Sequence, residues 1–148
     1  MSNRSGEDAK ALRTLVLAAD YYRQAVATAL GLGPTDATAM SQLRAAGEMN
    51  ARELATRLGL TPSAVTAVLG RLERAGLAQR IRHPTDRRQI VVCLTEDGVA
   101  TLDRSEHWLN DVLEHMDCRP DATNEVLSSL ASALKKQSAL VREEAENG

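Results

Sequence analysis

The sequence predicts a mainly α-helical fold with one small β-hairpin. Aromatic residues are almost absent, since Tyr21, Tyr22 and Trp108 are the only ones. The core must therefore be built from Leu, Val and Ala, and the Ala content favours helices. Long segments place apolar residues three and four positions apart, whereas one pair of short apolar runs flanks a polar turn. At 148 residues with 43% hydrophobic side chains, the chain has the size of one domain.

The net charge of −2 conceals an uneven distribution. Residues 51–90 contain eight arginines against three acidic residues, a local net charge of +5, whereas the remainder carries −7. Because salt screens electrostatic attraction over roughly 8 to 10 Å, a local basic face matters more to a polyanion than the total charge. The central segment is therefore the candidate for contact with nucleic acid.

The remaining composition narrows the class of protein. Two cysteines, Cys93 and Cys118, are too few for a disulfide framework and are typical of a reducing cytosol. The N-terminus lacks the apolar core of a signal peptide, and the longest helical candidate carries charges through its middle, which argues against a membrane partner. No Gly-rich phosphate loop or hydrolase motif occurs. We expect a soluble cytoplasmic protein that is not an enzyme and needs no cofactor.

Helices are predicted at both ends of the chain. The first is expected over residues 10–30, and Thr35 is expected to cap the next, with Asp36 in its first turn against the helix dipole. Thr95 is expected to cap a long helix that reaches about Met116. After a break at Pro120 and Asp121, a final helix follows, with apolar residues Val126, Leu127, Leu130, Leu134 and Val141.

The centre of the chain begins with a short helix, ARELATRL. Asn50 and Glu53 have the spacing of a capping box at its start, and Gly59 ends it. Only a tight turn separates this helix from the next one.

The second central helix is delimited by capping chemistry at both ends. Thr61 suits the N-cap and Pro62 the first helical position, where a missing N–H costs nothing. Gly76 suits a left-handed C-terminal position that would bring Leu77 back against Leu72. With the hairpin that follows, these helices predict a winged helix-turn-helix, whose second helix enters the major groove of DNA.

The outward face of this second helix is small and polar, which lets a helix approach base edges. Arg71 and Arg74 are long enough to reach a base or a phosphate. An ordinary solvated face is the alternative interpretation. The candidate DNA-binding residues of the helix are Thr61, Pro62, Ser63, Ala64, Thr66, Ala67, Arg71 and Arg74.

The hairpin consists of AQRIR, the loop HPTDRRQ and IVVCL. Asp86 and Arg88 are expected to form a charge-assisted pair that braces the loop, which leaves Arg87 to enter a narrow minor groove and Arg82 to contact a phosphate. A merely soluble hairpin tip would more often mix Gly, Asn, Ser and both charges.

Residues 51–98 resemble the MarR family of bacterial transcription regulators. Residues 86–95 match that family's wing motif D-x-R-x-x-x-V-x-L-T in full, and the TPSAVT and RLERAGL stretches add to the likeness. The flanking helices fit the same layout, so the resemblance covers almost the whole chain.

The resemblance implies an obligate homodimer with a pseudo-palindromic operator on double-stranded DNA. Residues 1–34 and 99–148 would supply dimerisation helices, and residues 35–98 the winged helix-turn-helix region. Two recognition helices of such a dimer would lie roughly 34 Å apart. The apolar stripes of the flanking helices could equally belong to the intrachain core.

The resemblance also implies repression that a small, often phenolic or anionic, effector relieves by binding between the dimer layer and the winged lobe. Such a ligand must bind the two states differently. The candidate effector-binding residues are Tyr21, Tyr22, Arg23 and Met40. Because Met and Tyr readily fill cores, simple packing is the alternative interpretation.

Three further alternatives stay open from the sequence. His107, Asp111 and His115 share one helix face and could ligate zinc in a metal-sensing regulator, although a solvent face needs the same residues. Cys118 could be a reactive thiol. A winged-helix module that docks a protein rather than DNA is the third alternative, and the basic helix and hairpin argue against it.

Overall fold

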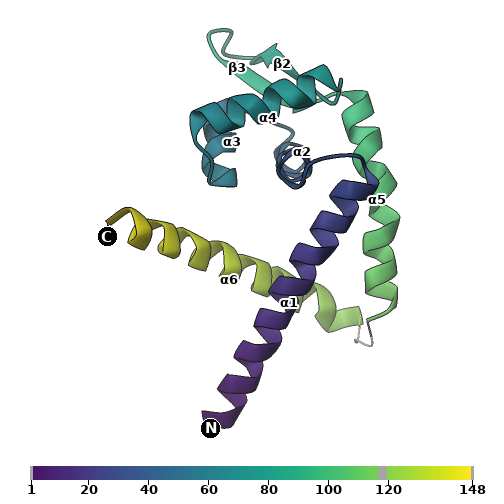
Figure 1. Ribbon diagram of the computed structural model, residues 1–148, viewed down its shortest axis with the longest axis vertical. Helices are drawn as coiled ribbons and strands as arrows, with labels where there is room; N and C mark the ends of the chain where they lie inside the picture. Colours follow the sequence, from purple (N-terminus) through teal and green to yellow (C-terminus); the bar gives the residue numbers. More distant parts are fainter. Residues whose placement is uncertain (1, 117–119, 148) are drawn as a thin grey trace. The chain divides into compact units, whose positions relative to one another are not determined.

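The computed structural model describes residues 2–116 and 120–147. The chain divides into two units, residues 1–108 and 109–148, each of which is described by itself. Six helices and one small sheet in the described residues confirm the predicted fold class (Figure 1). The elements are α1 (Ser2–Ala29), α2 (Pro34–Ala46), β1 (Glu48–Met49), α3 (Ala51–Leu58), α4 (Pro62–Arg74), β2 (Ala78–Arg82), β3 (Ile90–Leu94), α5 (Glu96–Glu114) and α6 (Pro120–Asn147).

The sheet is antiparallel with the order β1-β3-β2. The predicted hairpin is confirmed, with Arg80 opposite Val92 on β2 and β3. Strand β1 was not predicted, because its two residues are too few to show an alternating pattern; Glu48 pairs with Cys93 at this edge.

The core of the first unit lies between α2, α3, α4 and the sheet. Since α4 buries one apolar stripe here, its opposite face is left at the surface. The largest fully buried side chains are Met40, Leu43, Leu54, Val65, Leu69, Leu72 and Val92. None of the described helices is both long and apolar enough to cross a membrane.

The capping chemistry predicted for the central helices is confirmed. The Asn50 side chain accepts from the Glu53 amide at 2.8 Å. Thr61 Oγ1 accepts from the backbone amide of Ala64 at 3.2 Å. At the end of α4, Gly76 has φ +71°, a left-handed value that other residues rarely adopt.

Two expectations about the N-terminal helices are wrong. Helix α1 begins at Ser2 rather than near residue 10, because its first turns are polar and carry no apolar period. Helix α2 has Gly33 as N-cap and Pro34 in its first turn, with no side-chain cap, so Thr35 is not the capping residue. Proline is suited to the first turn because it has no N–H to satisfy.

The end of α4, the start of β2 and the start of α5 meet at Leu77. The Leu77 amide donates to the carbonyl of Leu72 at 2.9 Å, and the Leu77 carbonyl accepts from the amide of Thr95 at 3.1 Å. Thr95 Oγ1 donates to the carbonyl of Gly76 at 2.5 Å and accepts from the amide of Gly98 at 3.1 Å, which confirms Thr95 as the cap of α5. A Cβ on Gly98 would lie 2.0 Å from the Leu77 carbonyl oxygen, so only glycine fits there.

We predict that Gly98→Ala destabilises the protein by about 1 to 3 kcal/mol, because α5 must shift away from the Leu77 backbone. Gly70→Ala is the matched control, since a Cβ there meets nothing within 4 Å. Within helix α4 the added methyl should stabilise the protein by about 0.5 to 1 kcal/mol. Urea unfolding at one protein concentration measures both, and a Gly98→Ala variant as stable as the parent would contradict the close packing.

Candidate nucleic-acid interface

Helix α4 presents its predicted contact residues on the face opposite the core. Val65, Val68, Leu69 and Leu72 are buried, whereas the outward side chains are small. Thr66 Oγ1 donates to its own helix at the carbonyl of Pro62, 2.8 Å away, so its oxygen remains a possible acceptor. The exposed candidates are Thr61, Pro62, Ser63, Thr66 and Ala67, and Ala64 is half-buried.

Arg71 holds a buried carboxylate from a distant part of the sequence. Its Nε and Nη2 donate to the two oxygens of Asp36 at 2.9 and 2.7 Å. The Asp36 side chain is 10% exposed and that of Arg71 is 47% exposed. Hydrogen bonding to Asp36 and its negative charge raise the pKa of Arg71. Arg71 therefore links α4 to α2, a role that the sequence did not indicate, and its contact with DNA stays a prediction.

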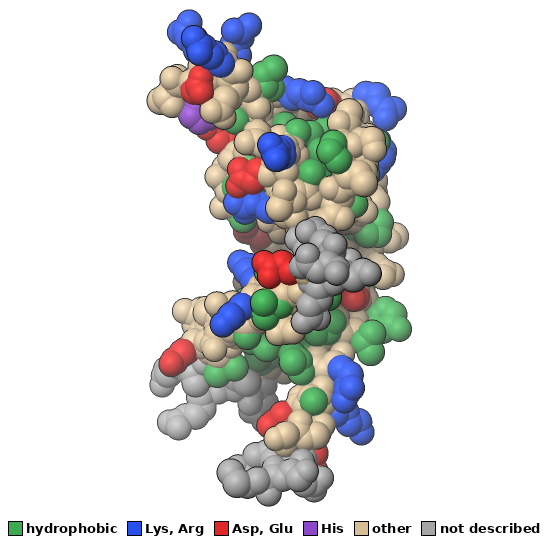
Figure 2. Space-filling model, turned by 90° about the vertical axis from the view of Figure 1, so that its left-hand side faces the viewer, with side chains coloured by type: hydrophobic (Ala, Val, Ile, Leu, Met, Phe, Trp, Pro, Cys, Tyr) green, Lys and Arg blue, Asp and Glu red, His purple; other side chains and the backbone are tan. Residues whose placement is uncertain are grey.

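The arginines of residues 51–90 fall into two groups. Three form ion pairs: Arg57 with Glu53, Arg71 with Asp36, and Arg80 with Glu73. The others form no ion pair with any residue that the structure describes: Arg52, Arg74, Arg82, Arg87 and Arg88. Figure 2 shows basic side chains gathered at the end of the first unit where the β2–β3 hairpin lies. The unpaired cations thus lie on α3, α4 and the hairpin, which we call the wing (residues 78–94).

The wing loop is braced by Asp86, though not through a guanidinium. Asp86 Oδ1 accepts from the backbone amide of Arg88 at 3.2 Å, and Oδ2 accepts from the side-chain amide of Gln89 at 2.8 Å. The expected charge-assisted pair between the Asp86 and Arg88 side chains is wrong for this structure. Because the carboxylate is occupied by amides, Arg87 and Arg88 both remain exposed and unpaired among the described residues.

The candidate effector residues of the first unit differ in how far they are exposed. Met40 is fully buried in the core, so the packing interpretation holds for it. Tyr21 is 73% exposed, and Arg23 pairs with Asp20 on the same helix at 2.9 Å. Tyr22 is half-buried.

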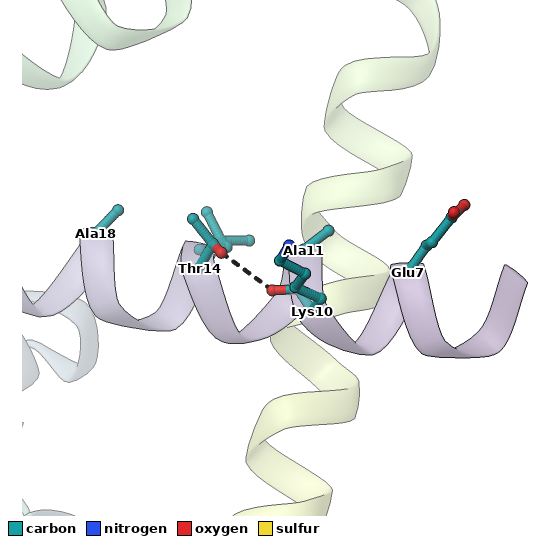
Figure 3. A pocket seen from close by; sticks show the side chains of 6 residues that line it. Glu7, Lys10, Ala11, Thr14 and Ala18 are labelled. Carbon is teal, nitrogen blue, oxygen red and sulfur yellow. Dashed lines mark hydrogen bonds between the residues drawn. The ribbon is translucent and has the colours of Figure 1, made fainter. Parts of the chain in front are cut away.

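An open depression of about 540 Å³ lies along α1 and contains none of these candidates. Figure 3 shows that its side chains come from one face of that helix. Its middle is lined by small or apolar side chains, with charged residues toward the N-terminal end. The lining residues are Glu7, Lys10, Ala11, Thr14, Leu15 and Ala18.

The alternative metal site is not formed. No group of three or more His, Cys, Asp or Glu within residues 2–116 and 120–147 could hold a metal ion. The ring of His107 packs on Trp108 with centroids 4.8 Å apart. His115 Nδ1 forms a hydrogen bond with the backbone carbonyl of Asp111 at 2.6 Å. Cys118, the candidate thiol, lies outside the described residues.

Comparison with known proteins identifies the family. The MarR family model matches residues 32–90. The structure of the transcriptional repressor CouR, bound to a 23-mer DNA duplex, is 31% identical to this chain with a TM-score of 0.63. The match covers 84% of this chain and 89% of CouR. The chain belongs to the MarR family.

Two further transcriptional regulators of similar structure support this assignment. A MarR family transcriptional regulator from Silicibacter pomeroyi is 25% identical with a TM-score of 0.68, over 86% of this chain and 87% of the other. The transcriptional regulator PA4135 is 28% identical with a TM-score of 0.63, over 86% of this chain and 95% of the other. None of the curated proteins matches the chain in sequence. The MarR likeness predicted from residues 51–98 is therefore confirmed, and it extends to most of the chain.

We predict that Arg71→Ala lowers the melting temperature of this MarR-family protein by a few degrees, because it leaves the buried Asp36 carboxylate without its cation. Arg74→Ala is the matched control, since among the described residues the Arg74 Nε donates only to the carbonyl of Gly70 in its own helix, at 3.0 Å. Thermal unfolding followed by circular dichroism, at one protein concentration, compares the two variants. Equal melting temperatures would show that the Asp36–Arg71 bonds do not stabilise the fold.

Proposed function

We propose that this MarR-family protein is a transcriptional repressor that binds double-stranded DNA in a sequence-specific manner. The observation that carries the proposal is the position of the unpaired arginines. Arg74 follows the small outward residues of α4, and Arg82, Arg87 and Arg88 lie on the wing. Small residues suit contact with base edges, and unpaired guanidinium groups suit phosphates or a narrow minor groove.

A protein-docking role for the winged lobe is the competing proposal. An interface with protein is depleted of charge at its centre, whereas the exposed face of α4 and the wing concentrates cations without carboxylate partners. Charge of this kind favours a polyanion over an apolar protein surface. Binding of DNA by the similar repressor CouR supports the same choice.

We propose that the DNA-binding form is a homodimer. Exposed apolar side chains lie in each of the long helices, at positions that a folded monomer would rarely leave open to water. A second copy of the chain would cover them, so residues 1–34 and 99–148 would supply the dimerisation helices. The exposed apolar residues of these helices are Leu12, Leu15, Val16 and Leu17 on α1, Val99, Leu109, Val112 and Leu113 on α5, and Val126, Leu127, Leu134, Leu140 and Val141 on α6.

The operator of a two-fold dimer would be pseudo-palindromic, with half-sites about one helical turn apart. A small-molecule effector would release the DNA only if it binds the free form more tightly than the bound form. Tyr21, Tyr22 and Arg23 remain the candidates for contact with the effector, because Met40 is fully buried in the core.

Selection of bound sequences from random DNA tests the whole proposal. Enrichment of an inverted repeat, with an affinity that falls steeply as salt rises, is the expected result because phosphate contacts release counterions. If no sequence is enriched, or if the affinity does not change with salt concentration, the proposal of a DNA-binding repressor is excluded.

We predict that Arg87→Ala weakens operator binding by about 1 to 3 kcal/mol. The residue is exposed and unpaired at the wing, so its loss removes a contact with DNA without disturbing the fold. Arg13→Ala removes the same charge from an exposed position of α1 and should leave affinity unchanged. Fluorescence anisotropy with labelled operator measures both variants. Equal affinities for Arg87→Ala and the parent would show that the wing is not part of the interface with DNA.

We predict that Leu113→Glu converts the dimer into a monomer. Leu113 is 45% exposed, so a glutamate there can stay hydrated in a free protomer but would be buried without a partner in a dimer. His107→Glu is the control, because His107 lies on the polar side of the same helix. Sedimentation velocity gives the masses, and a dimeric Leu113→Glu protein would show that this stripe is not in the interface.

A further inference from the structure

His83 begins the wing loop and is bonded to the backbone that follows it. Its Nδ1 accepts from the amide of Asp86 at 3.1 Å and from the amide of Thr85 at 3.3 Å, and the Thr85 hydroxyl lies 3.2 Å from the same nitrogen. Its Nε2 lies 3.7 Å from Oε1 of Glu48 on β1. The ring is half-buried between the loop and the edge strand.

These contacts fix where the proton of the imidazole sits. A backbone amide can only donate, so Nδ1 must keep its lone pair, and the single proton of the neutral ring is on Nε2, toward Glu48. A doubly protonated ring would place an N–H at Nδ1 directly against two other N–H donors. The two amide bonds to Nδ1 are therefore compatible only with a ring that carries no proton on that nitrogen.

The loop bonds that carry the arginines depend on this ring. His83 fixes the amide of Asp86, and the Asp86 side chain fixes the amide of Arg88 and the side chain of Gln89. The backbone closes the same turn, since the amide of Gln89 donates to the carbonyl of Asp86 and that of His83 to the carbonyl of Gln89, both at 2.9 Å. Arg87 and Arg88 thus lie in a turn whose conformation depends on the hydrogen bonds of His83.

We propose that His83 is a positioning residue of the wing, whose neutral imidazole holds Arg87 and Arg88 for DNA, so that protonation of the ring weakens operator binding. The inference rests on the proposed DNA-binding function. It gives the protein a dependence on pH, because imidazoles commonly change charge between about pH 5 and 8.

The charged groups around the ring oppose one another. Glu48 would attract an imidazolium, but the pair is partly exposed and such pairs contribute little. Asp86 adds a second negative charge inside the loop, and Arg82, Arg87 and Arg88 add positive charge on the same wing. Neither attraction restores the two backbone bonds that a proton on Nδ1 removes, so we expect the loop to loosen.

The test compares the parent with His83→Asn and His83→Ala. The Asn Oδ1 can accept near the position of Nδ1 but cannot be protonated, whereas Ala offers no acceptor. Operator affinity is measured by anisotropy at constant ionic strength from about pH 8 to about pH 5.5, the range in which imidazoles titrate. Because other groups also titrate, the difference between the parent and His83→Asn is the quantity that matters.

We predict that the parent loses roughly three- to tenfold in affinity on acidification, relative to His83→Asn. His83→Asn should match the parent at the upper pH, and His83→Ala should be weaker there. If the parent gains affinity in acid, His83 acts as a cation on phosphate, and the proposal is overturned. It is also overturned if His83→Asn retains the full dependence on pH.

Nitrogen NMR of the DNA-free protein separates this inference from the proposed function. The ring should show the tautomer with its proton on Nε2, and the amide signals of Thr85 and Asp86 should shift together with the His83 titration. Any other tautomer, or amides that ignore the titration, would overturn the capping role whatever the DNA results. If the NMR result holds but the parent binds no DNA at any pH, the proposed function fails and the claim that His83 controls operator affinity fails with it.

Discussion

The amide and carbonyl of Leu77 tie helix α4, the wing and α5 to one another. The amide ends α4 by bonding Leu72, and the carbonyl receives the amide of Thr95 where β3 passes into α5. Gly98 lets the first turn of α5 rest directly on the same carbonyl. Since α4, β2 and α5 share this one residue, a change in the direction of α5 must move the end of α4 as well.

Helix α2 supplies two further ties within the first unit. Asp36 at its start holds Arg71 of α4, and Arg44 near its end donates to Asp103 and Glu106 of α5. Hydrogen bonding to Asp103 and the charges of both carboxylates raise the pKa of Arg44. Partly exposed ion pairs are individually weak, but these act at separate points and across different elements. The winged lobe and the first half of α5 are therefore held together as one body.

Local chemistry made much of this chain predictable. The limits of α4 followed from Thr61, Pro62 and Gly76 because a cap acts within a few residues of itself. The bond between Asp36 and Arg71 spans 35 positions and depends on the packing of α2 against α4, which no periodicity encodes. The sequence therefore predicts Asp36 only as a charge at a helix end. The sequence does not indicate the role of His83, because that role depends on which ring nitrogen accepts from the loop backbone.

Some arginines form ion pairs and others do not, and this difference explains how a protein with a net negative charge could still bind a polyanion. An arginine bound to a carboxylate, such as Arg71 or Arg80, contributes little net field, but it fixes the elements from which other residues project. An unpaired arginine costs the fold little when it is exposed, and its charge is available to a phosphate. The carboxylates of residues 36, 53 and 73 thus hold three arginines of the basic segment in fixed positions. An acidic residue elsewhere in the chain weakens the field of these arginines only within roughly 10 Å, because salt screens its charge beyond that distance.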